Sequence, residues 1–260
     1  YLPNGDSEGV QSADDLNRQL QSVMIRHKRG DTKIDFPARN VRTSSFEPSR
    51  REQSLYTAVT DYVRTHDSQQ AWQHLVMLML QKEVVRSPWA VLSTVEKWLD
   101  DDGRDVTGRE RDKLLSIAKQ ARQIERTTKQ EKLLEIIRSV NRRMDTGRTI
   151  VFTQFRATQD AIVNALQTDA GGEDVPVHRV SGSLSSGEKD DQIQHFRERG
   201  GVLVTTDSIS EGRNIQFCNV IINYDLPWNP MSVEQRIGRI DRIGQDRDVY
   251  VYNLALEGTI

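Results

Sequence analysis

Short apolar runs alternate with helical segments over residues 147–260, and no other feature constrains the fold as strongly. Strands separated by helices of about 10–12 residues are typical of βαβ units, which build a parallel sheet. The runs are apolar on both sides of the pleat, as in strands that are covered by helices on both faces. We therefore expect an α/β fold with a mostly parallel sheet sandwiched by helices. The predicted strands are Thr149–Phe152, Val177–Val180, Val202–Thr205, Val220–Asn223 and Val249–Asn253, and the predicted helices are Ala157–Gln167, Gly187–Arg197 and Met231–Ile240.

The N-terminal half is predicted to be a linker followed by a helical insertion. Residues 1–48 are polar and contain prolines, so we interpret them as a linker that crosses a domain edge. Residues 49–146 carry apolar side chains at helical spacing and are predicted to be the insertion. Within it, Ser87 before Pro88 indicates a capped helix start, and one further helical region is expected over residues 110–144.

The composition excludes several classes of protein. No apolar run approaches the roughly 18–20 residues that span a bilayer, and no secretory signal is present, so we expect a cytoplasmic protein without a membrane contact. Cys218 is the only cysteine, so no internal disulfide can form. The five histidines show no metal-ligand spacing with one another or with Cys218, and no metal site is predicted. With a net charge of −2, any nucleic-acid contact must come from a local patch and from main-chain amides at helix N-termini.

The loops after the predicted strands are where a ligand is expected. In an open parallel sheet, ligands bind beyond the carboxyl ends of the strands. The strand Val202–Thr205 continues into a polar loop, residues 206–214, whose hydroxyls and amides could grip phosphates or a ribose. The alternative is an ordinary connection between a strand and a helix.

The segment Gln235–Gln245, with the sequence QRIGRIDRIGQ, gives a sharper signal. On a helix, Val233, Ile237 and Ile240 share the face that docks on the sheet, and Arg236 lies toward this core side. The opposite face presents three long polar side chains, two of them arginines, whose rigid donor forks match phosphate oxygens. The alternative is a solvated basic face that pairs with nearby aspartates. The three outward residues are Gln235, Arg239 and Arg242.

The order and spacing of these segments resemble the later motifs of superfamily-2 helicases. Phe152–Phe155 resembles motif IV, Val180–Gly182 the next phosphate-contacting motif, Thr205–Gln216 motif V, and Gln235–Gln245 motif VI. The form Gln-Arg-x-Gly-Arg-x-x-Arg-x-Gly-Gln is characteristic of Swi/Snf-type DNA translocases. The runs at 210–217 and 225–230 are similar to those of bacterial RapA-like members.

The resemblance implies a RecA-like C-terminal lobe that forms half of a DNA-dependent ATPase. It identifies Arg239 and Arg242 as arginine fingers, which stabilise the charge on the transferred phosphoryl group. It assigns no chemistry to the helices of the insertion. The positions implied for ATP binding are Gln235, Asn214, Gly212 and Asp207, and those implied for DNA-backbone contact are Gln154, Ser181, Gly182, Thr205 and Thr206.

The chain lacks a G-x-x-x-x-G-K-[ST] phosphate loop, which the family places in its N-terminal RecA-like lobe. ATP and Mg²⁺ are therefore expected to bind mainly to that lobe, and this chain alone, interpreted as a fragment, is expected to be inactive. Double-stranded DNA, the N-terminal lobe, and RNA polymerase or another DNA-bound protein are the expected partners. Two alternatives stay open, an RNA-helicase lobe and a non-catalytic interaction module that has kept the fold. The biological task stays open as well.

Overall fold

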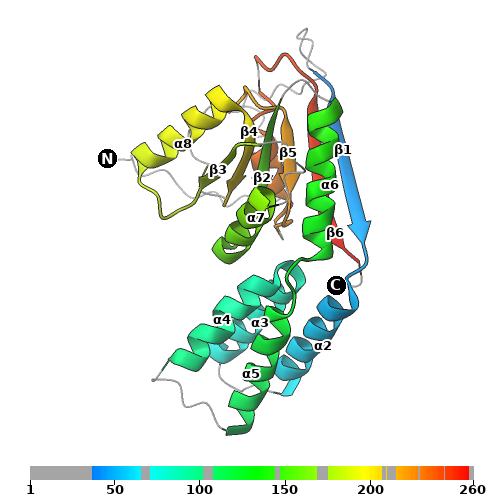
Figure 1. Ribbon diagram of the computed structural model, residues 1–260, viewed down its shortest axis with the longest axis vertical. Helices are drawn as coiled ribbons and strands as arrows, with labels where there is room; N and C mark the ends of the chain where they lie inside the picture. The colour runs from blue at the N-terminus through cyan, green and yellow to red at the C-terminus, as the bar shows by residue number, and fades with distance from the viewer. Residues whose placement is uncertain are drawn as a thin grey trace, which may run out of the picture. The chain divides into compact units, whose positions relative to one another are not determined.

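A computed structural model describes residues 37–65, 71–101, 108–143, 147–168, 175–206, 209, 215–227, 229–242 and 244–257 (Figure 1). The described residues form one mixed α/β unit, with a parallel sheet and a group of helices inserted after its first strand. None of the helices in these ranges is both long and apolar enough to cross a membrane.

Six parallel strands make up the sheet, in the order β1-β6-β5-β2-β4-β3. β2 lies near the centre, where Val151 pairs with Val204 on one side and with Ile222 on the other. All five strands predicted from the apolar runs are confirmed. The strands are β1 (Arg39–Phe46), β2 (Arg148–Phe152), β3 (Val177–Val180), β4 (Gly201–Thr205), β5 (Val220–Asn223) and β6 (Val249–Leu256).

The first strand, β1, lies in a region that the sequence assigned to the linker. Its register with β6 runs from Arg39 opposite Val249 to Phe46 opposite Leu256, so residues 39–46 belong to the sheet. β1 is an edge strand with mostly exposed side chains, and for this reason it carries no apolar run that would identify it. The first 36 residues of the predicted linker lie outside the described ranges.

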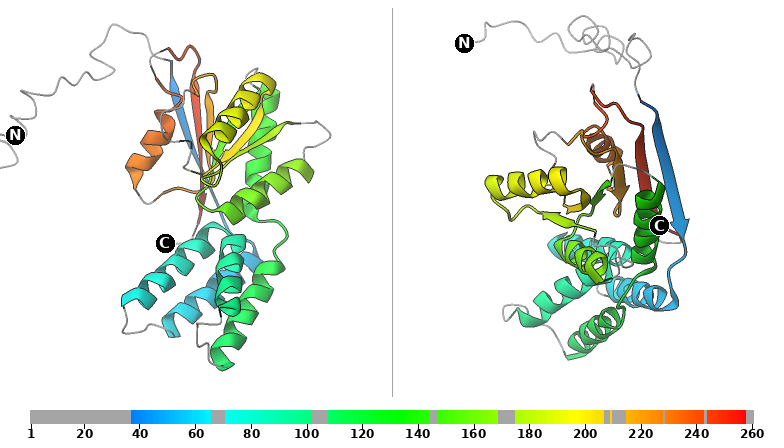
Figure 2. Two further views of the ribbon diagram at one scale, coloured as in Figure 1. Left: turned by 90° about the vertical axis from the view of Figure 1, so that its left-hand side faces the viewer. Right: turned by 45° about the horizontal axis from the view of Figure 1, so that its top comes forward.

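Helices cover both faces of the sheet, and the strands alternate their side chains between two cores. On β2, Val151 packs with α6 and α7, whereas Ile150 and Phe152 pack with α8 and with the region of α9. Figure 2 shows α9 on one side of the sheet and α6 and α7 on the other. A capping box formed by Ser185 and Glu188 is present at the start of α8. The helices are α6 (Thr128–Arg143), α7 (Arg156–Thr168), α8 (Ser186–Arg199) and α9 (Pro230–Ile237).

The helical insertion has a hydrophobic core of its own, which includes Leu80 and Ile117. It consists of α2 (Arg50–Thr65), α3 (Ala71–Arg86), α4 (Pro88–Asp100) and α5 (Gly108–Arg122). Ser87 caps α4, as predicted, by accepting a hydrogen bond from the main-chain nitrogen of Ala90. The structure divides the predicted helical region 110–144 at residues 123–127. Its second half, α6, packs on the sheet, so the insertion ends before α6, earlier than the predicted boundary at residue 146.

Candidate functional site

The carboxyl ends of three neighbouring strands bring the five residues of the DNA-contact prediction to one edge of the sheet. The main-chain nitrogen of Thr153 donates to Thr205 O at 3.0 Å, and that of Thr206 donates to Val180 O at 3.2 Å. The loops that follow β2, β4 and β3 therefore lie side by side. The residues of the DNA-contact prediction that they carry are Gln154, Ser181, Gly182, Thr205 and Thr206.

These five residues differ in how far their side chains reach the surface. Gly182 is exposed, and Gln154 and Thr206 are half-buried. Ser181 is buried, and its Oγ lies 2.9 Å from Oγ of Ser183. Thr205 is fully buried, and its hydroxyl donates to Thr206 O at 2.6 Å, so its side chain supports the loop from inside.

The topology has a switch point between β2 and β5. These strands are neighbours, but β2 continues into α7 on one face and β5 continues toward α9 on the opposite face. Such a change of face is the switch point at which open parallel sheets bind ligands. Thr153 and Gln154 follow β2 there, and Asp225 follows β5.

A buried carboxylate that the motif analysis left without a role organises this switch point. Asp225 is fully buried; its Oδ2 accepts from Thr153 Oγ1 at 2.6 Å and from the main-chain nitrogen of Gln154 at 3.1 Å. Its Oδ1 lies 3.3 Å from Nζ of Lys129, in an ion pair whose side chains are 0% and 8% exposed. The one local signal for Asp225 in the sequence is an aspartate shortly after an apolar strand.

Helix α9 begins at a clear cap and is fixed from two sides. Asn229 Oδ1 accepts from Met231 N at 3.0 Å, and Pro230 occupies the first turn. On the outer side, Nη1 and Nη2 of Arg39 in β1 donate to the two carboxylate oxygens of Glu234 at 2.9 and 2.6 Å. These bonds fix the segment that carries the predicted arginines.

Arg236 points into the protein, as its place on the helical wheel predicts. It is 2% exposed, donates from Nη1 to Asn223 Oδ1 at 3.1 Å and to Asp225 O at 2.9 Å, and lies over the ring of Phe152. Ile237 and Ile240 are buried beside it, and the predicted core face of the segment is confirmed.

The helix ends at Ile237, whereas the prediction placed its end at Ile240. Glycine is a poor helix former, and after Gly238 the chain tightens into i→i+3 hydrogen bonds, such as Ile240 N to Ile237 O at 3.0 Å. Arg239 and Arg242 consequently leave from turns, whereas the exposed Gln235 remains on the helix.

The two arginines offer donors suited to an anion. Arg239 is half-buried, and its Nε is a buried donor without a hydrogen-bond acceptor among the described residues. A buried donor without an acceptor costs free energy. Arg242 is exposed and uses its Nε to donate to Gly238 O at 2.8 Å. Asp207, Gly212 and Asn214, which the resemblance also implies for ATP, lie outside the described residues.

Other reactive side chains have structural roles. His178 lies 2.9 Å from Gly200 O through Nε2, and burial lowers its pKa. Burial raises the pKa of the Cys218 thiol to about 12, so this thiol is unreactive at neutral pH. No group of three or more His, Cys, Asp or Glu side chains within the described ranges could hold a metal ion.

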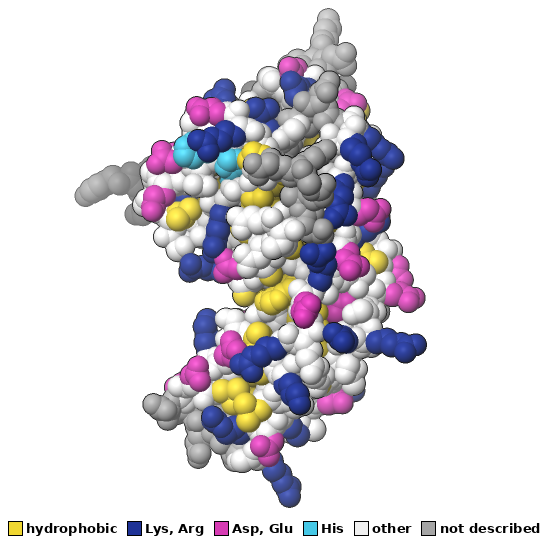
Figure 3. Space-filling model, in the orientation of Figure 1, with side chains coloured by type: hydrophobic (Ala, Val, Ile, Leu, Met, Phe, Trp, Pro, Cys, Tyr) yellow, Lys and Arg dark blue, Asp and Glu magenta, His cyan; other side chains and the backbone are white. Residues whose placement is uncertain are grey.

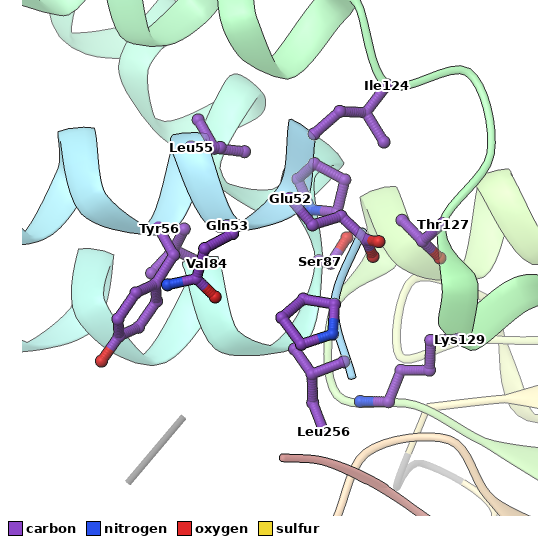
Figure 4. A pocket seen from close by; sticks show the side chains of 12 residues that line it. Glu52, Gln53, Leu55, Tyr56, Val84, Ser87, Ile124, Thr127, Lys129 and Leu256 are labelled. Atoms are coloured by element: carbon purple, nitrogen blue, oxygen red, sulfur yellow. The ribbon is translucent and has the colours of Figure 1, made fainter. Parts of the chain in front are cut away.

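A pocket lies at the base of the insertion, and Lys129 is one of the residues that line it (Figure 4). It lies between the start of α2, the start of α4 and the start of α6. None of the predicted site residues lines it, so it is separate from the strand edge. Its lining includes Glu52, Val84, Pro88, Thr127, Lys129 and Leu256.

Comparisons with known proteins agree with this arrangement. Residues 128–244 match the model of the helicase conserved C-terminal domain. The chain is 35% identical over 252 residues to the uncharacterized ATP-dependent helicase YqhH of Bacillus subtilis, covering 96% of this chain and 43% of that protein. A stretch of 75 residues is 49% identical to the RNA polymerase-associated protein RapA of Vibrio parahaemolyticus, covering 28% of this chain and 8% of that protein.

A solved structure shares the fold. The Sulfolobus solfataricus SWI2/SNF2 ATPase core, in complex with dsDNA, matches with a TM-score of 0.55 and 21% identity. The match covers 94% of this chain and 47% of that one. The chain therefore spans less than half the length of each of these relatives.

Proposed function

Because the chain is a C-terminal lobe of the superfamily-2, Swi/Snf-type helicases, we propose that it forms one half of an ATP-dependent motor that moves along double-stranded DNA. The observation that carries the proposal is the division among the three arginines of one short segment. Arg236 is buried and bonded to β5 and its loop, whereas Arg239 is half-buried and Arg242 is exposed, and both lie past the end of the anchored helix. A purely structural segment needs the first arginine and has no need of the other two.

On the nucleotide side, Arg239 and Arg242 would donate to the γ-phosphate of ATP, and Gln235 would assist them. ATP, when bound with Mg²⁺, supplies the phosphoryl group whose transfer to water drives the motor. Donors that meet the charge developing on that group lower the barrier, and a single arginine is worth about 10³–10⁵ in rate. A phosphate-loop sequence is absent from the 260 residues, so most of the nucleotide and its metal would be held by a second RecA-like lobe.

On the nucleic-acid side, Gln154, Gly182 and Thr206 would follow one strand of the duplex through its phosphates. Neutral donors suit this task, because a translocase must hold phosphates without reading bases and then release them. Basic and acidic side chains are interspersed on the face seen in Figure 3, so this face carries no broad basic surface.

Two alternatives make different predictions. An RNA-helicase lobe would respond to RNA, but the Swi/Snf-type match and the duplex bound in the solved relative favour DNA. A non-catalytic module would keep the fold without needing Arg239 or Arg242. RNA polymerase, or another DNA-bound protein, is the partner class that the RapA relatives suggest.

The test is phosphate release by the 260-residue chain and by the full-length protein that contains it, each with and without duplex DNA and with single-stranded RNA. We expect turnover by the full-length protein alone, stimulated by the duplex. DNA-stimulated turnover by the isolated chain would contradict the two-lobe proposal, and stimulation by RNA alone would favour the RNA-helicase alternative.

A further inference from the structure

Asp225 lies where the two proposed contact regions meet. Through its carboxylate it fixes the hydroxyl of Thr153 and the main-chain amide of Gln154, at the end of β2. Through its carbonyl oxygen it accepts from Arg236, three residues before Arg239. One residue is thus bonded both to the loop proposed to contact DNA and to the helix that leads to the proposed arginine fingers.

Lys129 supplies the counter-charge that allows the Asp225 carboxylate to be fully buried. Its Nζ lies 3.3 Å from Oδ1 of Asp225 and 4.9 Å from the centre of the Tyr224 ring. A buried carboxylate without a counter-charge is strongly destabilising, whereas a paired and hydrogen-bonded one is tolerated. An ionised carboxylate accepts hydrogen bonds and donates none, which suits the two donors of Thr153 and Gln154.

The same polar network continues into the helical insertion. The hydroxyl of Tyr224 lies 3.3 Å from Oγ1 of Thr127, and Thr128 Oγ1 donates to Oε2 of Glu52 in α2 at 2.7 Å. Figure 4 shows Glu52, Thr127 and Lys129 together around the pocket at the base of the insertion. Polar contacts therefore link α2, the start of α6, and the carboxyl ends of β2 and β5.

We propose that Asp225 is a positioning residue that couples the DNA-contacting loop after β2 to the arginine-bearing segment after β5. The inference rests on the proposed function, since it needs DNA at Gln154 and nucleotide at Arg239. Its consequence is that the stimulation of ATP hydrolysis by DNA depends on the bonds of Asp225, whereas hydrolysis without DNA does not.

Two threonines in the same short segment provide a matched test in the full-length protein. Thr153 and Thr149 are both fully buried, but only the Thr153 hydroxyl has an acceptor, Asp225; Thr149 Oγ1 has none among the described residues. Thr153→Val removes one bond to Asp225, and Thr149→Val makes the same chemical change without that loss. Thr153→Ser keeps the hydroxyl and serves as the rescue.

The readout is the ratio of kcat with saturating duplex to kcat without DNA, measured well below the unfolding temperature. A hydrogen bond to a charged group is worth about tenfold in an equilibrium constant. We expect Thr153→Val to lower the ratio about tenfold, with the DNA-free rate and the KM for ATP within about twofold of wild type. Thr149→Val and Thr153→Ser should keep the wild-type ratio.

A lower unfolding temperature with an unchanged ratio would show a merely structural role and overturn the proposal. An equal loss in Thr149→Val would overturn it too. Should Thr153→Val fail to fold, the double variant Lys129→Met with Asp225→Asn removes both charges without leaving one unpaired. It should fold and lose the stimulation, and a retained ratio would contradict the coupling. If the wild-type protein shows no stimulation by DNA, the proposed function itself fails, which is a separate outcome.

Discussion

Arg236 of α9 donates a hydrogen bond to Oδ1 of Asn223, the last residue of β5, at 3.1 Å. The contact ties the helix to the strand edge inside the protein and leaves no path for this arginine to a ligand in solution. Asn223 in turn donates from Nδ2 to Oδ1 of Asn253 in β6 at 2.8 Å, so the arginine is part of a polar row that runs from α9 to β6. One of the three arginines in the motif is therefore a structural residue.

Arg236→Ala should lower the free energy of unfolding of the chain by about 3 kcal/mol, because it removes two hydrogen bonds to a charged donor and leaves buried acceptors unsatisfied. Urea unfolding followed by circular dichroism measures this change. The control is Arg242→Ala, an exposed position where a change within about 0.5 kcal/mol is expected. Equal stability of the two variants would contradict the inward role of Arg236.

Glu83 makes the stability of the helical insertion depend on pH. Burial raises the pKa of this carboxyl from 4.5 to about 7, although Thr94 Oγ1 donates to its Oε1 at 2.9 Å. Because the folded pKa is the higher one, the folded state holds a proton that the unfolded state has released between pH 4.5 and 7. The stabilisation that the protonated Glu83 carboxyl gives to the folded state is fully present below about pH 4.5 and is lost as the pH rises through 7.

Glu83→Gln, a neutral isostere, should therefore match the wild-type chain near pH 4 and be more stable by on the order of 2 kcal/mol at pH 8. The measurement is the difference in unfolding free energy between variant and wild type at several pH values, which cancels the other titrating groups. A difference that does not change with pH would contradict the claim that burial raises the pKa of Glu83.

DNA binding by this lobe should be weak, independent of sequence and only slightly sensitive to salt. Each phosphate neutralised by a cation contributes about −0.9 to the slope of log K against log salt, whereas a hydroxyl releases no counterion. Thr206→Ala should weaken binding to two unrelated duplexes equally and leave the slope unchanged. Fluorescence anisotropy at several salt concentrations measures both quantities.

The matched control is Thr168→Ala, an exposed threonine at the far end of α7 from the strand edge, which should leave binding unchanged. A preference between the two duplexes would indicate base readout and would rule out simple tracking of the backbone.

Local pattern was sufficient to predict five strands and the inward face of the α9 segment. Buried parallel strands need apolar side chains on both faces, and this need leaves continuous runs such as Val202–Thr205 in the sequence. The same reasoning missed β1, because an edge strand can remain polar. It also missed the break between α5 and α6, since residues 123–127 contain neither glycine nor proline.

The Lys129–Asp225 pair could not be predicted from any local pattern. Its two residues are 96 positions apart. Only the folding of α6 onto the sheet brings them together. The motif analysis found Gln235 and Arg242, which are exposed, and Arg239, which is half-buried, whereas the buried Lys129–Asp225 pair required the three-dimensional structure.

The effect of Arg239 on ATP turnover tests the account most directly. In the full-length protein at saturating duplex, Arg239→Ala should lower kcat for phosphate release by about 10³ or more, and Arg242→Ala should do the same. The affinity for ATP should fall much less, because these donors act most strongly on the transition state. A kcat within a few-fold of wild type in both variants, with DNA-stimulated turnover intact, would contradict the claim that this lobe supplies the arginine fingers of a DNA-dependent ATPase.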